Sequence, residues 1–587
     1  MRYLKTLSLI FSFLLMNGSL SLGSVGGPES VSESRFQPTV ATRGLVVSDD
    51  RIASLWGSEI LRQGGNAIDA AVATAFTLAV TRPHFASLGG GGFLVYCPAP
   101  RKTDHSTPSP CHVLDYREQA PEKAHKDLFV PFQKTHPLAS RDGALASGIP
   151  GTTAGLLEAL EKFGTFSRQK LLSKPIDIAK KGYLFTAHSE KAARERWAAM
   201  NLSAKKIFGC ATNLGVPTQP CTSGTQVKQP DLAKVLLAIS RSGKKGFYEG
   251  PVAHQLVQGI QSAGGILTEN DLKTYSVQVR SPLQGKYENW DIVTVPPPAS
   301  GGVLVLQLLA YAERAARSGA LQQGFGSTHL LHAIAHGMAL SFADRSQHLG
   351  DPDFQKTPWT NLLTQTYLDQ RWKTFNPDSI HLPENAGKIE LSEGQHTTHL
   401  SVIDHLGNAV AITTTINDNF GSGFVPPGTG IVMNNQMDDF SIQPGTPNLF
   451  GLTGSESNSI APHKRPLSSM SPTIVRDLDG NNRIVIGAAG GPRIISAVFL
   501  CLLNRLTFQM PLPDAVAAPR FHHQWNPESL SLERFGFPWD TTSKLEAKGY
   551  TLKQVNRIGI VHALEHFIDG RSWGVADPRG EGAAVAE

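Results

Sequence analysis

The stretch 395–417 constrains the fold of this chain more than any other. Two runs in which apolar residues alternate with other residues flank the segment 404–408. This pattern predicts a β-hairpin with a three-residue loop, in which Gly407 supplies the left-handed residue. The loop length fixes the register, so we expect Leu400 to lie opposite Ile412 and one face of the hairpin to be aliphatic and buried.

On the other face, the same register places Thr397 across from Thr415. Threonine pairs are common in sheets and stabilise them by only about 0.2 to 1 kcal/mol, which is the structural interpretation. The functional interpretation makes Thr397 a nucleophile. Its base would be its own α-amino group, freed by cleavage of the bond that follows His396. The hairpin alone leaves both interpretations open.

Composition limits the class of protein. The chain has 587 residues, of which 40% are hydrophobic and 18% charged, as in ordinary globular proteins. Its formal net charge is +5, and Lys and Arg are spread along the chain without a run. The sequence therefore predicts neither nucleic-acid binding nor attachment to an anionic membrane.

The N-terminus has the pattern of a secretory signal. Met1 to Lys5 is basic, 7–16 is an apolar run, and small residues follow at 19–24. We expect a signal peptide over 1–24 and export to the periplasm or medium. The apolar run is too short to span a bilayer, and no later segment approaches that length, so no membrane insertion is expected.

Five cysteines fit an oxidising compartment without a fold that depends on disulfides. Cys97 with Cys111 and Cys210 with Cys221 each bracket a Pro-containing loop, and we expect these two pairs to be bonded. Cys501 lies in an apolar helix-like run and is expected to be a buried packing residue. None of the five has the spacing of a metal site.

Periodicity and capping residues predict most other elements, and the half from 151 to about 390 is expected to be mostly helical. The expected helices are 51–63, 67–80, 152–163, 229–241, 251–263, 328–343 and 494–506. The expected strands are 93–96, 112–116, 430–433 and a second hairpin of 473–475 with 483–486.

Two element ends carry chemically useful groups. Arg117 follows the strand 112–116, where an arginine is usually an ion-paired surface group but can also clamp a substrate carboxylate. Gly490 and Gly491 lie between a strand and a helix. They are either a plain turn or a source of free backbone NH groups for an oxyanion.

Several motifs, in order and spacing, together resemble the γ-glutamyltranspeptidases along nearly the whole chain after the signal. They are Gly64-Gly65-Asn66-Ala67, Leu88 to Phe93, Asp115 to Glu118, Thr397-Thr398-His399, Asn434 to Phe440, Arg465 to Pro472, Gly490-Gly491 and Arg520 to Trp525. The resemblance implies an α/β fold, the four-layer αββα sandwich of the N-terminal-nucleophile hydrolases. It also implies self-cleavage of one precursor into a large subunit, 25–396, and a small catalytic subunit, 397–587, which stay together.

The resemblance also implies roles for individual residues. Thr397 would be the nucleophile, Thr415 would hydrogen-bond to its hydroxyl, and the NH groups of Gly490 and Gly491 would form the oxyanion hole. The α-carboxylate of the γ-glutamyl group would be held by Arg117, Ser468 and Ser469, and its α-ammonium by Asn417, Gln436 and Asp439. No metal or organic cofactor is implied.

The implied reaction transfers a γ-glutamyl group from glutathione or a related donor to water, or to an acceptor amino acid or peptide. One alternative is a related acylase that cleaves cephalosporin side chains. A second, from another class of protein, is an exported solute-binding protein that catalyses no reaction. The chain departs from the family pattern at Phe450, where bacterial relatives commonly have a tyrosine, and at Ala488-Ala489, which replace Ser-Pro.

Overall fold

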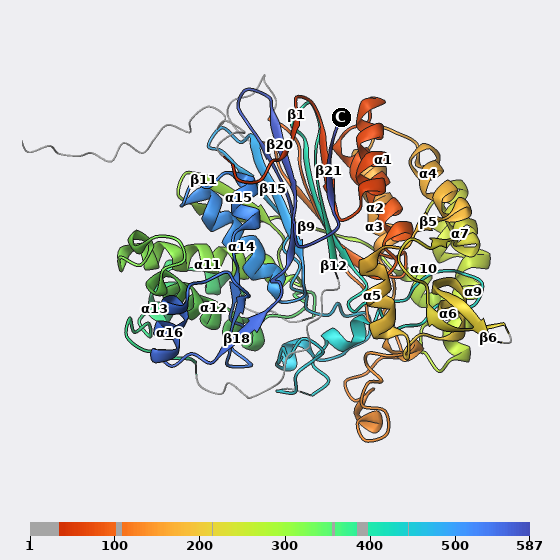
Figure 1. Ribbon diagram of the computed structural model, residues 1–587. Coiled ribbons are helices and arrows are strands. Elements are labelled where there is room, and N and C mark those ends of the chain that lie inside the picture. The colour runs from red at the N-terminus through yellow and green to blue at the C-terminus, as the bar shows by residue number, and fades with distance from the viewer. Residues whose placement is uncertain (1–33, 101–108, 214, 355–358, 384–396, 444) are drawn as a thin grey trace, which may run out of the picture.

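A computed structural model describes residues 34–100, 109–213, 215–354, 359–383, 397–443 and 445–587. The expected signal peptide and the bond between His396 and Thr397 therefore lie outside, or at the edge of, the described residues. Two seven-stranded sheets stack face to face, and helices cover the outer face of each (Figure 1). This arrangement confirms the predicted αββα sandwich.

The sheet that contains the predicted hairpin is called here the β12 sheet. Its strands, in spatial order, are β21 (Ala583–Ala586), β2 (Leu45–Ser48), β12 (Thr397–Ile403), β13 (Ala409–Thr415), β3 (Gly91–Cys97), β4 (His112–Tyr116) and β9 (Gln278–Arg280). The opposing sheet is called the β15 sheet. Its strands are β1 (Thr39–Ala41), β20 (Ser572–Ala576), β19 (Ile560–His566), β15 (Asn482–Ala489), β14 (Thr473–Arg476), β11 (Trp290–Thr294) and β10 (Leu283–Tyr287).

Helices from the first half of the chain cover the β12 sheet, and later helices cover the β15 sheet (Figure 1). The first group is α1 (Arg51–Arg62), α2 (Ala67–Thr81), α3 (Thr152–Phe163), α4 (Arg168–Lys181), α5 (Ala187–Arg196), α6 (Leu202–Phe208), α7 (Pro230–Ser242), α8 (Lys245–Tyr248), α9 (Gly250–Ser262) and α10 (Glu269–Thr274). The second is α11 (Ser300–Arg317), α12 (Thr328–His348), α13 (Gln365–Trp372), α14 (Arg493–Leu506), α15 (Leu512–Ala517) and α16 (Trp539–Ala547). Short strands β5 (Tyr183–Leu184), β6 (Gly209–Asn213), β7 (Val216–Pro220), β8 (Gln226–Val227), β16 (Phe521–His522), β17 (Leu530–Glu533) and β18 (Leu552–Val555) form three small sheets.

The hairpin has the predicted register. Leu400 pairs with Ile412, and Thr397 pairs with Thr415. The backbone NH of Asp404 donates to the carbonyl of Asn408 over 3.1 Å, which closes a three-residue loop. Gly407 in this loop has a φ of +86°, the left-handed conformation that the glycine was expected to supply.

Both faces of the hairpin are buried, one against helices and the other against the second sheet. The aliphatic face belongs to the core beneath α2, as expected. The polar face forms hydrogen bonds at the centre of the sandwich: His399 contacts Thr413 (2.8 Å) and Ser401 (3.0 Å), and the Ser401 hydroxyl reaches the carbonyl of Val485 on β15 (3.2 Å). A Cβ on Gly487 would lie 2.3 Å from the His399 ring, so only glycine permits this approach.

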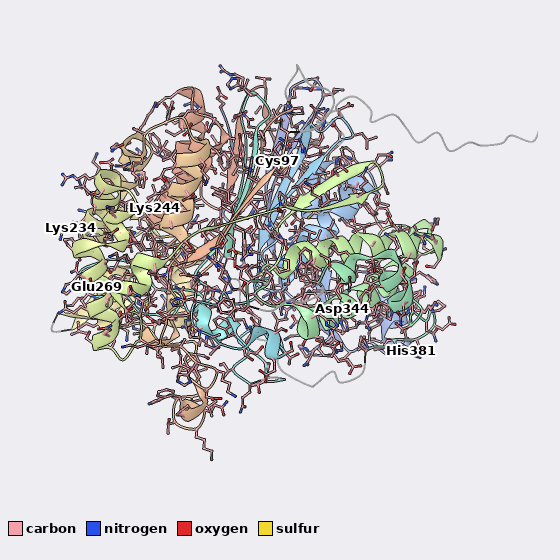
Figure 2. All side chains as sticks on the ribbon, turned by 180° about the vertical axis from the view of Figure 1, so that it is seen from behind. Cys97, Lys234, Lys244, Glu269, Asp344 and His381 are labelled. Atoms are coloured by element: carbon pink, nitrogen blue, oxygen red, sulfur yellow. A yellow bond between two sulfur atoms is a disulfide. The ribbon has the colours of Figure 1, made fainter. Side chains whose placement is uncertain are left out.

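Several smaller predictions are confirmed. Helix α1 begins after Asp50, whose side chain accepts from the NH of Ala53, and α2 begins at a capping box formed by Asn66 and Asp69. The disulfides Cys97–Cys111 and Cys210–Cys221 are present, and Cys501 is buried. Cys97 lies in the central layers, whereas the labelled charged residues lie among the outer helices on both sides (Figure 2).

One prediction about an element is wrong. The stretch 430–433 is not a strand: it forms only an isolated bridge between Gly89 and Met433, because the chain turns at Gly428 and Gly430, which both have positive φ. The half from 151 to 390 is mostly helical, as expected, since α3 to α13 lie within it; it also contributes β9 to the edge of one sheet and the pair β10 and β11 to the edge of the other. No helix among the described residues is both long enough and apolar enough to cross a membrane.

Candidate active site

The hairpin places two hydroxyl groups side by side at the start of β12. The Oγ1 atoms of Thr397 and Thr415 lie 3.1 Å apart, and the Thr415 hydroxyl also accepts the NH of Asn417 over 3.0 Å. Thr397 is buried, with 7% of its surface exposed, so little bulk water competes for its hydroxyl. This pair is the contact that the register predicted.

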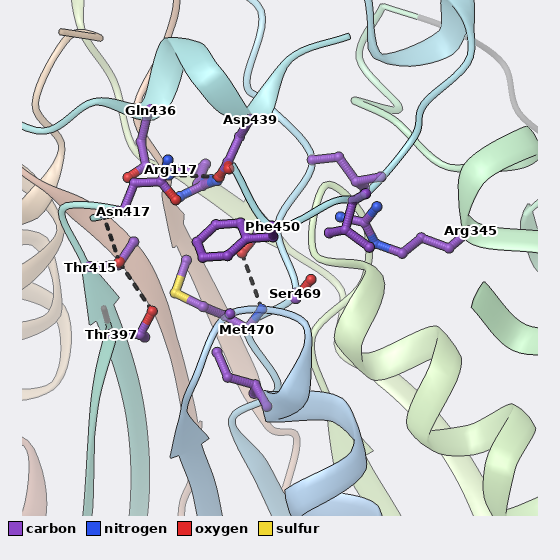
Figure 3. Close-up of a pocket in the computed structure, with 15 residues that line it drawn as sticks. Arg117, Arg345, Thr397, Thr415, Asn417, Gln436, Asp439, Phe450, Ser469 and Met470 are labelled. Atoms are coloured by element: carbon purple, nitrogen blue, oxygen red, sulfur yellow. Dashed lines mark hydrogen bonds and ion pairs between the residues drawn. The ribbon is translucent and has the colours of Figure 1, made fainter. Parts of the chain in front are cut away.

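A pocket opens beside this pair, with a cavity volume of about 30 Å³, room for about two water molecules. All the site residues predicted from the sequence line it except Gly490 (Figure 3). The lining residues are Arg117, Arg345, Thr397, Thr415, Asn417, Gln436, Asp439, Phe450, Leu452, Leu467, Ser468, Ser469, Met470, Gly491 and Ile494. They come from the end of β4, α12, both hairpin strands, the loops after β13 and the start of α14, so the pocket exists only in the folded sandwich.

Arg117 forms the charged centre of the pocket. Its Nη2 donates to Asp439 over 2.5 Å, its Nη1 donates to Glu118 over 3.2 Å, and its Nε donates to the carbonyl of Pro466 over 3.2 Å. Burial raises the pKa of Glu118 to about 7, against the opposing effect of Arg117. Burial also raises the pKa of Asp439, and Arg117 again opposes the shift. Arg117 is thus a buried ion-paired group, not a surface arginine.

Acceptor groups gather on one side of this arginine. Gln436 donates through Nε2 to Asp439 over 2.8 Å, while its Oε1 is buried and has no hydrogen-bond partner among the described residues. Asn417 lies next to this group with a φ of +76°, a conformation that places its side chain against the loop at Asn435. An unsatisfied carbonyl oxygen beside a carboxylate is suited to receiving an ammonium group.

The two serines lie on the opposite wall, on the loop before β14. The NH of Ser468 donates to the carbonyl of Pro298, and the carbonyl of Ser468 accepts both the NH and the hydroxyl of Ser300, at 2.7 and 2.6 Å. Ser468 is therefore fixed against the start of α11. Ser469 follows it at the edge of the pocket (Figure 3).

Gly490 and Gly491 form the turn from β15 into α14. Gly491 has a φ of +57° and lines the pocket, whereas Gly490, with a φ of +135°, lies beside it. No hydrogen bond from either NH to a described residue is present, so both donors are available. A Cβ on Gly491 would lie 2.9 Å from the Phe450 ring, which therefore covers this turn.

Phe450 closes the pocket without a hydroxyl group. Its NH donates to Asn448 over 3.0 Å, and its carbonyl accepts Nε2 of Gln524 over 3.0 Å, so the backbone of the covering loop is anchored at both groups. The ring is 7% exposed and packs as part of the main core. Packing of the Phe450 ring closes the pocket in this protein, whereas a tyrosine at the same position could also use its hydroxyl.

Sequence reasoning missed Arg345, which reaches the pocket from α12 (Figure 3). The signal that could have found it is a basic residue that continues the apolar face of a long buried helix, because such a charge needs a partner or a ligand.

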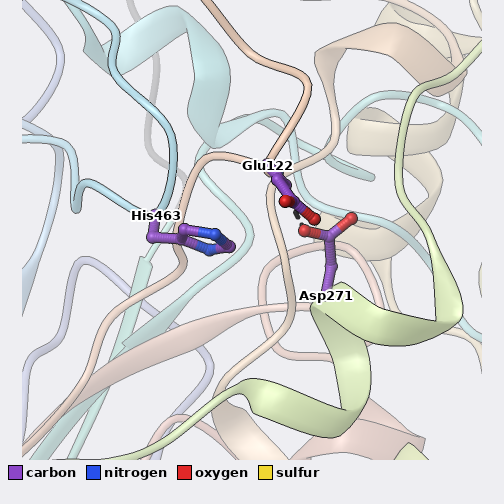
Figure 4. A group of neighbouring side chains, drawn as sticks. All are labelled: Glu122, Asp271 and His463. Atoms are coloured by element: carbon purple, nitrogen blue, oxygen red, sulfur yellow. Dashed lines mark hydrogen bonds between the residues drawn. The ribbon is translucent and has the colours of Figure 1, made fainter.

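A second group of ligand-type side chains lies apart from the pocket: Glu122, Asp271 and His463 have ligand atoms within 4.8 Å of one another (Figure 4). Asp271 is already used as a capping residue, since its carboxylate accepts the NH and hydroxyl of Thr268 and the NH of Glu122. Glu122 is exposed. The position of Asp271 is explained by its role as a helix-capping residue, and we assign no metal to this group.

Fold and site together define an N-terminal-nucleophile hydrolase of the αββα type. In agreement, the structure of a cephalosporin acylase from Bacillus halodurans matches the fold with a TM-score of 0.78, at 24% identity, over 96% of this chain and 99% of that one. The model of the family described as "Gamma-glutamyltranspeptidase" matches residues 53–587, and the chain belongs to this family.

Two relatives show how close the match is. The glutathione hydrolase proenzyme of Escherichia coli K12 is 38% identical over 96% of both chains. The crystal structure of Helicobacter pylori gamma-glutamyltranspeptidase is 35% identical, with a TM-score of 0.52, over 59% of this chain and 95% of that one.

Proposed function

We infer that this chain is a γ-glutamyl-transferring enzyme, which moves the γ-glutamyl group of glutathione or a similar donor to water or to an amino acid or peptide. The observation that carries this inference is that Thr397 and the ion-paired Arg117 line one pocket. One end of that pocket offers a nucleophile, and the other offers cationic and anionic groups that match an amino-acid head group.

We propose that the active form arises by self-cleavage before Thr397. The Thr397 hydroxyl would attack the carbonyl of His396, and the peptide nitrogen would leave as the new α-amino group. Water would then hydrolyse the ester, leaving a carboxylate on His396. The products would be a large subunit, 25–396 after removal of the signal 1–24, and a small subunit, 397–587, in one exported heterodimer.

In each turnover, Oγ1 of Thr397 would attack the γ-carbonyl carbon while the α-amino group takes the hydroxyl proton. The C–N bond of the donor breaks, that proton passes to the leaving amine, and a γ-glutamyl ester remains. Water resolves the ester to glutamate, and an acceptor amine resolves it to a new γ-glutamyl amide. Thr415 would orient the hydroxyl, and the NH groups of Gly490 and Gly491 would stabilise the oxyanion.

Binding of the head group would follow the charges in the pocket. The α-carboxylate would lie against Arg117, Ser468 and Ser469, and the α-ammonium against Asn417, Gln436 and Asp439. The unsatisfied Oε1 of Gln436 supports the second assignment. A glutaryl side chain lacks the ammonium group, so these three acceptors favour γ-glutamyl donors over the cephalosporin side chains of the acylase alternative.

The test is release of p-nitroaniline from a γ-glutamyl anilide, with and without an acceptor dipeptide, by the purified enzyme and by Thr397→Ala. We expect activity and two fragments for the first, and an intact inactive chain for the second. Release from a glutaryl anilide alone would favour the acylase. An intact wild-type chain that binds γ-glutamyl compounds without consuming them would favour a solute-binding protein.

A further inference from the structure

The pocket contains a second guanidinium group that is not ion-paired with any carboxylate among the described residues. Arg345 lies on α12 with 5% of its surface exposed. Its side chain forms no ion pair with a described residue, and the one side-chain hydrogen bond to them runs from Nε to the hydroxyl of Ser300, over 3.0 Å. Arg117, by contrast, is paired with two carboxylates.

A buried arginine without a partner is costly, because burial removes the hydration of the charge. Burial, and secondarily Arg117, lowers the pKa of Arg345 to about 10, although Asp439 opposes the shift. The group is still protonated at neutral pH. Arg345 lines the same pocket as Arg117 and Asp439, two of the groups that would bind the amino acid.

The charges around Arg117 indicate a role for Arg345. Arg117 is already compensated by Glu118 and Asp439 before any substrate enters. A carboxylate that approached Arg117 alone would meet the carboxyl groups of Asp439 and Glu118 beside it. Arg345 supplies the additional positive charge, and its terminal nitrogens, which bond to no described residue, lie on the side of Ser469 (Figure 3).

Building on the proposed function, we propose that Arg345 is a second cation for the α-carboxylate of the donor, acting together with Arg117. Through its Nε it also holds the hydroxyl of Ser300, which donates to the carbonyl of Ser468. The same side chain therefore positions the serine wall and faces the substrate. The site recognises a carboxylate with two guanidinium groups, of which only one is paired in the free protein.

The test compares anilides that differ only in the head group: γ-glutamyl, glutaryl, which keeps the carboxylate but lacks the ammonium, and 4-aminobutyryl, which keeps the ammonium but lacks the carboxylate. We expect Arg345→Gln to lower kcat/KM about 10- to 100-fold for the first two donors, the effect of losing one hydrogen bond to a charged group. The third donor should change less than about threefold, and Arg345→Lys should restore part of the loss.

Inhibition constants give the same comparison if the third donor turns over slowly. L-glutamate and its α-amide differ only in the carboxylate, and we expect Arg345→Gln to reduce the preference for glutamate about tenfold or more. Arg314→Gln is the matched control, because Arg314 is equally buried at 3% exposure but pairs with Asp369 away from the pocket.

Equal losses for all three donors, or an unchanged preference for glutamate, would reduce Arg345 to a positioning residue and overturn the proposal. Ser300→Ala separates the two roles, because it removes the hydroxyl that connects Arg345 to Ser468 and leaves the charge: we expect a small loss that is the same for every donor. Failure of the wild-type enzyme to release anything from the γ-glutamyl anilide would contradict the proposed function instead.

Discussion

At the scale of single residues, the hydroxyl pair of Thr397 and Thr415 depends on the register of one hairpin. The two side chains face each other because the three-residue loop at Gly407 fixes which residues are opposite. Shifting β12 by one residue relative to β13 would turn the Thr397 side chain toward the aliphatic core. The position of the proposed nucleophile is thus specified by a turn that lies at the far end of the same strands.

We predict that Thr415→Val lowers kcat for the γ-glutamyl anilide about 10- to 100-fold, because valine keeps the shape but loses the hydroxyl beside Thr397. Steady-state kinetics on fully cleaved enzyme measure this. Thr414→Val is the control: its hydroxyl donates to the carbonyl of Gly91 on the other face of the strand, so kcat should change little. Equal effects of the two variants would argue for general damage to the strand.

The raised pKa of Glu118 predicts a pH dependence of stability. Its folded-state pKa, about 7, exceeds the ordinary value of 4.5. Between these values the folded protein keeps a proton that the unfolded chain releases. The contribution of this group to stability is therefore complete below about pH 4.5 and lost as the pH rises through 7.

Glu118→Gln removes this titration. The parent for this test is the uncut Thr397→Ala chain, and its free energy of unfolding is measured in urea at pH 4.5 and pH 8. The free energy of unfolding should fall between these two pH values, and the fall should be larger in the parent than in the parent with Glu118→Gln, by up to about 3 kcal/mol. Glu122→Gln, an exposed neighbour, serves as the control and should follow the parent. Identical pH profiles of the parent and Glu118→Gln would show that Glu118 does not titrate in this range.

At the scale of elements, the loop around Phe450 closes the pocket by packing and by backbone hydrogen bonds. We predict that Phe450→Ala raises the ratio of hydrolysis to transfer several-fold at a fixed dipeptide concentration. Loss of the ring over Gly491 would admit water to the ester. Quantifying glutamate and γ-glutamyl dipeptide in one reaction tests this.

Leu449→Ala is the matched control, because Leu449 belongs to the same loop and does not line the pocket. We expect its product ratio to stay close to that of the wild type. A product ratio unaffected by Phe450→Ala would mean that other lining residues, such as Leu452, exclude water from the ester.

Elements built from local signals could be predicted from the sequence. The hairpin follows from alternation and one glycine, and α2 follows from a capping box and an apolar run. Strands β10 and β11 form a local hairpin that the sequence analysis did not identify, and their place in the sheet could not be predicted, because it is set by the pairing of β11 with β14, some 180 residues away in sequence. Arg345 was missed for the same reason, since only the fold brings α12 to the pocket.

At the scale of the whole molecule, the two predicted subunits share both sheets. In the β12 sheet, β2 from the large subunit lies between β21 and β12 from the small one. In the β15 sheet, β11 of the large subunit pairs with β14 of the small one. The proposed cleavage before Thr397 would therefore not separate two bodies.

We predict that the two fragments elute together in size-exclusion chromatography at neutral pH, including in 1 M salt. Hydrophobic contacts and strand pairing, which salt does not screen, hold them together. They should separate only in denaturant. The uncut Thr397→Ala chain is the reference for elution volume, and dissociation of the wild-type fragments in salt alone would contradict the shared sheets.

The exchange of strands between the subunits also limits when cleavage can happen. Neither predicted fragment contains a complete sheet, so we expect the backbone to be continuous while the sandwich assembles and the cut to come afterwards. To refold after maturation, the enzyme would have to reassemble two separate chains whose strands lie side by side in both sheets. We expect it to lose activity for good where its uncut precursor recovers, so the lifetime of the mature enzyme is set by how slowly it first opens.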